Sequence, residues 1–223
     1  MKTGINTNIL SDFEKCKGRL CVQLSNNKYV ARNVPHRDIC DLTLTMRVNI
    51  NGGIDGFLLE DKLAFAIVDN TMLNEWGVTD VDSLFDLAIK NSRRLFPEII
   101  TSLYDILKKH SFRTLSKEIA FSKLVPIHVV TSSRGTGGAA AIFYPQVADL
   151  LCAEFNDDIL ILPSSIHEVL VLPLNACKLL GRSADDLKSL VKMVNLEEVA
   201  PEDQLSDNVY IYRKEEKKFD YFS

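Results

Sequence analysis

The feature that most constrains the fold is a pair of short apolar runs, residues 159–162 and 169–172, with six residues between them. Each run is typical of a strand that is buried on both faces. Because so short a link joins neighbouring antiparallel strands, the two runs predict a hairpin. Several other expected strand pairs have links of similar length, which favours a mainly antiparallel sheet.

A second strand signal is an alternation of apolar and polar side chains between residues 39 and 50. Its apolar positions are Leu42, Leu44, Met46 and Val48, and its polar positions are Thr43, Thr45, Arg47 and Asn49. This period of two predicts a half-buried strand, and Asn51-Gly52-Gly53 predicts a hairpin turn after it. Further strands are expected at residues 19–24, 63–68, 125–131, 139–143 and 209–212.

Helices are expected between these strands. A short helix is expected at residues 12–17, and a longer one follows Thr79 as N-cap. Pro97 is predicted to open a helix whose apolar positions are Ile99, Leu103, Ile106 and Leu107. Further helices are expected at 145–155 and after Ser183, with Leu187, Leu190, Val191 and Val194 facing inward. The aromatic residues at 219–222 are expected to fray or to serve as a docking tail.

This mixture of elements predicts an α+β fold, with one or more mainly antiparallel mixed sheets and packed helices. A weak repeat at an offset of 104 residues pairs Thr79 with Ser183 and Asp82 with Asp186. It leaves open two related strand–strand–helix halves or two independently capped helices. At 223 residues we expect a single domain, 1–223, with a possible sub-division into 1–110 and 123–223 joined by the basic segment 108–123.

The charge is unevenly distributed along the chain. Between Asp149 and Asp207, twelve acidic residues face four basic ones, so this stretch carries −8 within a net charge of −4. The rest of the chain is therefore at +4, and much of that excess lies in segment 108–123 with Lys108, Lys109 and Arg113. The net charge excludes a generally basic nucleic-acid coat. The asymmetry either serves solvation and attraction between the halves or steers a partner.

The five cysteines have no CxxC spacing and do not flank histidines, so they predict neither a metal site nor a disulfide framework. A reducing cytoplasm with buried or idle thiols fits them best. The sequence contains no apolar run near the ~18 residues of a membrane span, and residues 1–6 lack the apolar core of a signal peptide. We therefore expect a cytoplasmic protein without membrane association, metal or cofactor.

Two polar clusters are the candidate sites. The first contains His36 and Arg37, and its simplest interpretation is an arginine that pairs with a carboxylate. The second contains Ser164, Ser165, His167 and Glu168, at the turn of the predicted 159–172 hairpin. Ser165 and His167 share a face, which permits a Ser–His contact. However, the sequence has no Gly-x-Ser-x-Gly elbow, so turn chemistry is favoured over catalysis.

A glycine-rich run, Arg134-Gly135-Thr136-Gly137-Gly138, suggests phosphate binding at first sight. It lacks the P-loop pattern and is expected to link two strands rather than a strand and a helix. We therefore expect a hairpin loop with glycines at positive φ. His36 and His167 are a potential pair of metal ligands, but the sequence indicates no third ligand.

Several motifs, in a fixed order, resemble the uncharacterised bacterial family DUF5688. The resemblance covers residues 12–212 and is most specific around Ser164 and His167. It implies no activity, since the family has none established, and longer relatives are expected to carry an additional N-terminal segment. The motifs are Pro35-His36-Arg37, Trp76-Gly77-Val78, Leu95-Phe96-Pro97, Gly138-Ala139-Ala140, Tyr144-Pro145, Leu162-Pro163-Ser164-Ser165-Ile166-His167-Glu168-Val169, Val199-Ala200-Pro201-Glu202 and Leu205-Ser206-Asp207.

These observations favour a non-enzymatic cytoplasmic protein of a bacterium or mobile element. We expect it to bind a macromolecule, most readily a protein, or to act as a regulator, for example in counter-defence. Its candidate binding residues are Arg37, Arg134, Ser164, Glu168, Lys108, Lys109 and Arg113. One alternative is a hydrolase or small-ligand enzyme with Ser165, His167 and His36 at its site. Another is nucleic-acid binding through segment 108–123.

Overall fold

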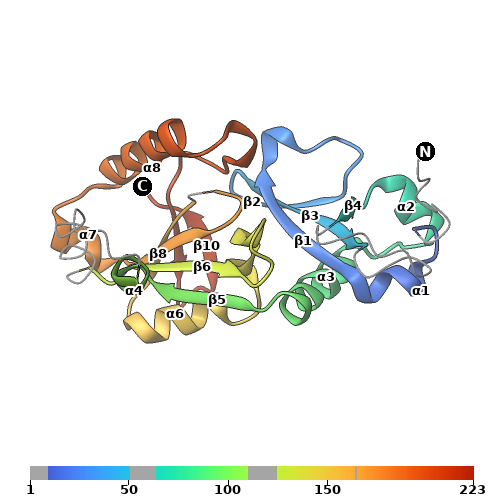
Figure 1. The fold of residues 1–223 in the computed structure, drawn as a ribbon, viewed down its shortest axis with the longest axis horizontal. Coiled ribbons are helices and arrows are strands. Elements are labelled where there is room, and N and C mark those ends of the chain that lie inside the picture. The colour runs from blue at the N-terminus through green and yellow to red at the C-terminus, as the bar shows by residue number, and fades with distance from the viewer. Residues whose placement is uncertain (1–9, 51–63, 110–124, 164) are drawn as a thin grey trace.

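The computed structural model describes residues 10–50, 64–109, 125–163 and 165–223, which form two antiparallel sheets side by side (Figure 1). The first sheet has the order β1-β3-β2, with β4 also paired to β3, and the second has the order β10-β9-β7-β8-β6-β5. The strands are β1 (Leu20–Asn26), β2 (His36–Ile39), β3 (Leu42–Asn49), β4 (Phe65–Ile67), β5 (Glu98–Ser102), β6 (His128–Ser132), β7 (Ile159–Leu162), β8 (Val169–Pro173), β9 (Tyr210–Arg213) and β10 (Lys218–Tyr221).

Helices pack around both sheets, so the predicted α+β class is confirmed. Helix α3 packs on β1 of the first sheet, while α6 and α8 lie on opposite sides of the second sheet (Figure 1). The α-helices are α1 (Phe13–Cys16), α2 (Asn70–Glu75), α3 (Val81–Leu95), α4 (Leu103–Lys109), α6 (Val147–Phe155), α7 (Asn175–Leu180) and α8 (Ala184–Glu198). Short 3₁₀ helices are η2 (Lys17–Arg19), η3 (Asn27–Tyr29), η4 (Gly138–Phe143) and η5 (Pro201–Asp203).

The hairpin at the centre of the second sheet is confirmed, since β7 pairs antiparallel with β8 and places Ile161 opposite Val171. Both faces of β7 are buried, as its continuous apolar run predicts. Ile159 and Ile161 face the larger core with α6, whereas Leu160 and Leu162 face a smaller core with α8. Ser183 caps helix α8 as expected, and Asp186 completes a capping box with it.

The larger core runs through both sheets and joins them. It contains residues of β1 and β3, of β6 and β7, and of η4 and α6. Strand β5 belongs to the second sheet and helix α4 packs on β5, although both elements precede residue 110. The two sheets are unequal, with four and six strands. The single domain and its sub-division stay predictions.

The helix predicted to open at Pro97 is wrong, because residues 98–102 form strand β5. Ile99, Ile100 and Thr101 are β-branched, and β5 pairs with β6 along its length. The ladder of hydrogen bonds outweighs the helical signal of a proline at the first position. The helix α4 begins only at Leu103.

The strand predicted at residues 139–143 is also wrong, because this segment is the buried 3₁₀ helix η4. Its alanines are small enough to be enclosed completely, and the N–H of Ala139 donates to the carbonyl of Ile166 over 3.0 Å. The run from Arg134 to Gly138 is therefore not a hairpin loop between strands. It carries the chain from β6 into η4, and Gly135 and Gly137 do adopt positive φ.

Smaller differences have local causes. Asp80, not Thr79, caps α3, because its carboxylate accepts from the N–H of Ser83 over 3.0 Å. Leu190 is 45% exposed, since the buried stripe of α8 runs through positions 187, 191 and 195 instead. Phe219 lies in β10 with its ring 4.7 Å from that of Tyr212, so the aromatic tail is an ordered edge strand. The turn predicted at residues 51–53 lies outside the described residues.

Asp41 ties the first sheet to the second. Its carboxylate accepts hydrogen bonds from Tyr210 over 2.6 Å, Ser206 over 2.7 Å and Asn208 over 3.2 Å. Burial alone would raise the pKa of Asp41, but these hydrogen bonds outweigh it and hold the pKa below its ordinary value of 3.8. Burial also raises the pKa of Tyr210, so its hydroxyl stays protonated and donates.

Gly138 has less space around it than any other described glycine. A Cβ at this position would lie 2.2 Å from Oγ1 of Thr131 and 2.7 Å from the carbonyl oxygen of His167. We predict that Gly138→Ala lowers the free energy of unfolding by at least ~2 kcal/mol, because the backbone of His167 cannot move aside without disturbing the sheet. The control is Gly18→Ala, whose Cβ would meet nothing within 4 Å. Equal urea midpoints for the two variants would refute the contact.

Asp41→Asn tests the link between the sheets. Because the native carboxylate has a lowered pKa, its stabilising contribution is complete above pH 3.8 and disappears as the pH falls through the lowered pKa. We predict that the variant is about 2 kcal/mol less stable than the native chain at pH 7. The gap should shrink in acid, as measured by denaturant unfolding at several pH values. The matched control is Asp105→Asn on α4, which should change stability little. A gap independent of pH would contradict the assignment.

Candidate functional site

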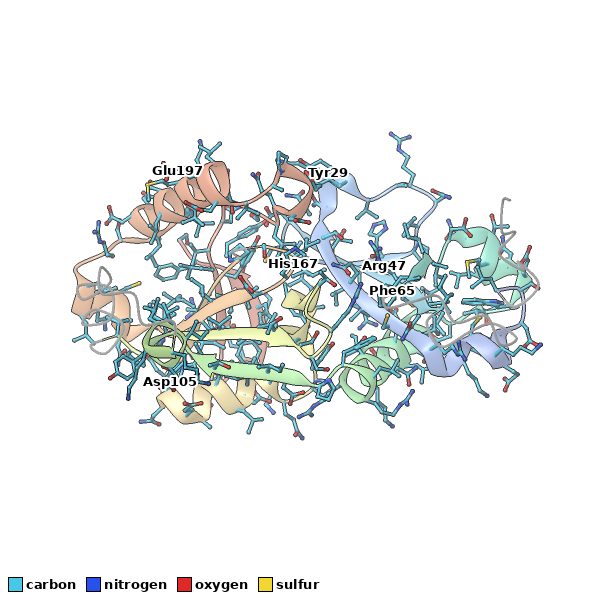
Figure 2. The ribbon with its side chains drawn as sticks, viewed as in Figure 1. Tyr29, Arg47, Phe65, Asp105, His167 and Glu197 are labelled. Atoms are coloured by element: carbon cyan, nitrogen blue, oxygen red, sulfur yellow. The ribbon has the colours of Figure 1, made fainter. Side chains whose placement is uncertain are left out.

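A cleft of about 350 Å³ lies at the boundary between the two sheets. Its walls come from β1, η3 and β3 on one side, and from the loop after β6, the turn before β8 and η5 on the other. In Figure 2, Arg47 and His167 lie on either side of this boundary, with Tyr29 at its upper edge. The volume is in the range that small-molecule sites occupy.

The floor of the cleft is the polar face of the first sheet. In the β1–β3 ladder, Cys21 lies opposite Arg47 and Gln23 lies opposite Thr45, so these side chains share one face. The period-two pattern predicted that β3 is half-buried, but Thr45 on its polar side is only 5% exposed, and Gln23 opposite it on β1 is 4% exposed. The reason is that the loop after β6 covers this face, with Gly137 packed directly on the Gln23 side chain.

Two arginines of the cleft form no ion pair with the described residues. The Nε atoms of Arg47 and Arg134 are both buried and unbonded, and across the described ranges neither guanidinium forms an ion pair. The Arg134 guanidinium lies 3.7 Å from the ring centroid of Phe65, a cation–π contact that holds it in place. The two arginines therefore place two positive charges in one partly buried cleft.

The shifts in the pKa of the two arginines agree with their place in a partly buried cleft. Burial lowers the pKa of Arg47 and of Arg134, and the neighbouring Arg47 lowers the pKa of Arg134 further. Both side chains stay charged at neutral pH, since arginine ordinarily titrates above ~12. Burial raises the pKa of the adjacent Cys21 thiol to about 11, despite the two cations beside it. Cys21 is therefore not an activated nucleophile.

His167 holds together three segments of one wall of the cleft, namely the loop after β6, the turn before β8 and η5. Its Nδ1 accepts from the N–H of Gly137 over 3.1 Å, and its Nε2 lies 3.3 Å from the Asp203 carboxylate in η5. Because a backbone N–H can only donate, Nδ1 is the acceptor and Nε2 carries the proton. Neither ring nitrogen is left to take a proton from a hydroxyl. The ring therefore positions the glycine-rich loop relative to η5.

Ser165 is buried next to His167 but does not form the contact that a nucleophile needs. Its Oγ accepts from the backbone N–H of His167 over 3.1 Å, and its own N–H donates to the carbonyl of Glu168 over 3.3 Å. These bonds shape the turn between β7 and β8. Ser164 lies outside the described residues.

The cluster of His36 and Arg37 lies on β2 and does not line the cleft. Arg37 binds Asp86 over 2.9 Å and Asp82 over 3.3 Å, and lies 5.1 Å from the ring centroid of Phe85. It fastens α3 to the first sheet. The exposed His36 has Nδ1 2.9 Å from the carbonyl of Val34. The fold does not bring His36 and His167 together in the cleft.

The remaining candidates are scattered. Lys108 and Lys109 are exposed at the end of α4, whereas Arg113 lies outside the described residues. Within the described parts of the chain, no three His, Cys, Asp or Glu side chains are grouped so as to hold a metal ion. The same residues include no helix long and apolar enough to span a membrane.

Sequence reasoning found Arg134 and His167 but missed Arg47, Tyr29 and Gln204. The available signal was Arg47 itself, an arginine within a strand whose alternate residues are all apolar. The pairing of β1 with β3, which puts Gln23 and Arg47 on one face, is not visible in the sequence. Tyr29 and Gln204 carry no local signal at all.

Comparison with known proteins gives one result. The model of a family described as "Family of unknown function (DUF5688)" matches residues 1–214. No curated protein and no solved structure matches the chain.

Proposed function

The chain belongs to DUF5688, a family of unknown function, and we propose that it is a non-enzymatic binding protein whose cleft holds an anionic group. Arg47 and Arg134 are the residues that would bind this group. The chemistry that they recognise is that of a phosphate or carboxylate, to which guanidinium groups donate paired hydrogen bonds.

The observation that carries the proposal is that Arg47 and Arg134 have no ion-pair partner among the described residues. Removing a guanidinium from water costs free energy unless it is paired and hydrogen-bonded. Arg37 and Arg93 of the same chain meet that requirement, with carboxylates at 2.9 Å and 2.5 Å respectively. In the described residues Arg47 and Arg134 have no such partner. An anion from outside the chain would supply it.

The hydrolase or small-ligand enzyme is the weaker alternative. It requires His167 to accept a proton from Ser165 or another hydroxyl, with His36 or a carboxylate nearby. The bond from the N–H of Gly137 occupies the nitrogen that such a base would use. Ser165 accepts from a backbone N–H instead of donating to an imidazole.

We propose further that the protein is cytoplasmic, in a bacterium or mobile element, and that it has a protein partner and a regulatory or counter-defence role. All five cysteines are free thiols, which suits a reducing compartment. The acidic stretch 149–207 offers a charged surface to a partner. Nucleic-acid binding through segment 108–123 is a second alternative, supported among the described residues by the exposed Lys108 and Lys109.

Arg47→Met tests the binding site. The substitution keeps most of the side-chain volume and removes one of the two guanidinium groups. We predict that the native protein binds inorganic phosphate in low-salt buffer and that the variant binds it at least about tenfold more weakly. Isothermal titration calorimetry measures both affinities.

The matched control is Arg32→Met, because Arg32 is exposed and does not line the cleft. This control removes the same formal charge and should leave phosphate affinity within about twofold, since exposed charges at a distance are screened. If neither phosphate nor acetate binds the native protein, or if both variants weaken binding equally, the cleft is not the anion site.

A further inference from the structure

Besides the two arginines, the cleft contains an aromatic ring and hydrogen-bond acceptors that an anion alone would not need. Resting on the proposed function, we infer that the bound anion is the 5′-phosphate of a nucleotide, either free or at the end of a strand. Tyr29 contacts the base, and η5 contacts the sugar and the base edge.

The charge of the cleft favours a phosphate monoester over a carboxylate. Two guanidinium groups converge from different walls, Arg47 from β3 and Arg134 from the loop after β6. A carboxylate carries one negative charge and would leave the second arginine unbalanced. A phosphate monoester carries about −1.5 to −2 at pH 7 and has three acceptor oxygens for donors on opposite sides. Glu202 also lines the cleft, but it is exposed and therefore screened.

Acceptors, not donors, characterise the η5 side of the cleft. The amide nitrogen of Gln204 donates to the carbonyls of Asn195 over 2.7 Å and Val199 over 3.0 Å, which uses both of its hydrogens. Its amide oxygen is the group left for a ligand. The Glu202 carboxylate is a second acceptor on this wall. A ligand that fits must therefore be an anion at one end and a hydrogen-bond donor at the other, as are ribose hydroxyls and base amino groups.

An aromatic ring completes the pattern. Tyr29 lines the cleft from η3 and is 71% exposed, although tyrosine usually buries most of its ring. Asn26 holds η3 in place, since its side chain accepts from the N–H of Lys28 over 2.9 Å and donates to the carbonyl of Leu205. The ring therefore stands on a fixed support at the edge of the cleft, where a planar base can stack on it.

The experiment measures, by calorimetry on the full chain, the affinities of a series of ligands of increasing size. The series consists of inorganic phosphate, ribose 5-phosphate, the four nucleoside 5′-monophosphates and a 5′-phosphorylated dinucleotide. We expect at least one nucleotide to bind about tenfold more tightly than ribose 5-phosphate, because base stacking adds to the phosphate contact. Tyr29→Ala should bring the ratio of these two affinities towards one, and Tyr29→Phe should retain it. Tighter binding of the dinucleotide than of its 5′-mononucleotide would identify a strand end as the source.

The outcomes separate the inference from the function on which it rests. If phosphate and ribose 5-phosphate bind but no nucleotide binds more tightly, the cleft is an anion site and the nucleotide assignment is wrong. The assignment is equally wrong if Tyr29→Ala leaves the ratio unchanged. If no phosphate compound binds the native protein, the proposed function itself fails. Since Tyr29 is exposed, its variants should fold like the native chain, which unfolding curves would verify.

Discussion

The structure depends on the burial of a polar sheet face. On the cleft side, β1 and β3 carry Gln23, Thr45 and Arg47, of which Gln23 and Arg47 line the cleft, and buried polar groups need partners. The loop after β6 covers this face, and the chain then packs closely at Gly138, where η4 passes against β6 and the turn before β8. His167 then connects that loop to η5. Within the part of the chain that the structure describes, the same packing leaves Arg47 and Arg134 without an ion-pair partner.

Much of the fold was predictable from local patterns. The continuous apolar runs at 159–162 and 169–172, the alternation in β3 and the Ser183 cap each depend on neighbouring residues, and each appears in the structure. The helix predicted from Pro97 and the strand predicted at residues 139–143 were wrong because tertiary contacts determined the secondary structure of these segments. The β-branched run in β5 pairs with β6. The alanine run in η4 is buried in the larger core.

The candidate site was predictable only in part, because it is assembled from distant segments. Arg134 and His167 carry motifs that can be recognised in isolation, and the fold places both in the cleft. Arg47 lines the cleft because the loop after β6 covers the polar face of β3. The alternating pattern predicted that this face is exposed to solvent. Arg37 had the stronger local signal, yet it serves to hold α3 through Asp82 and Asp86. Residue type and spacing thus identify charged side chains, but packing decides which of them stay unpaired.

The central claim is that Arg47 is kept for binding rather than for folding, and its effect on stability tests this most directly. The measurement is the free energy of unfolding of Arg47→Met and of the native chain, by urea titration in buffer without phosphate or other polyvalent anions. Because a partly buried charge without a partner opposes folding, the variant should be at least as stable as the native protein. A loss of about 2 kcal/mol or more would contradict the claim, since it would make Arg47 a structural residue.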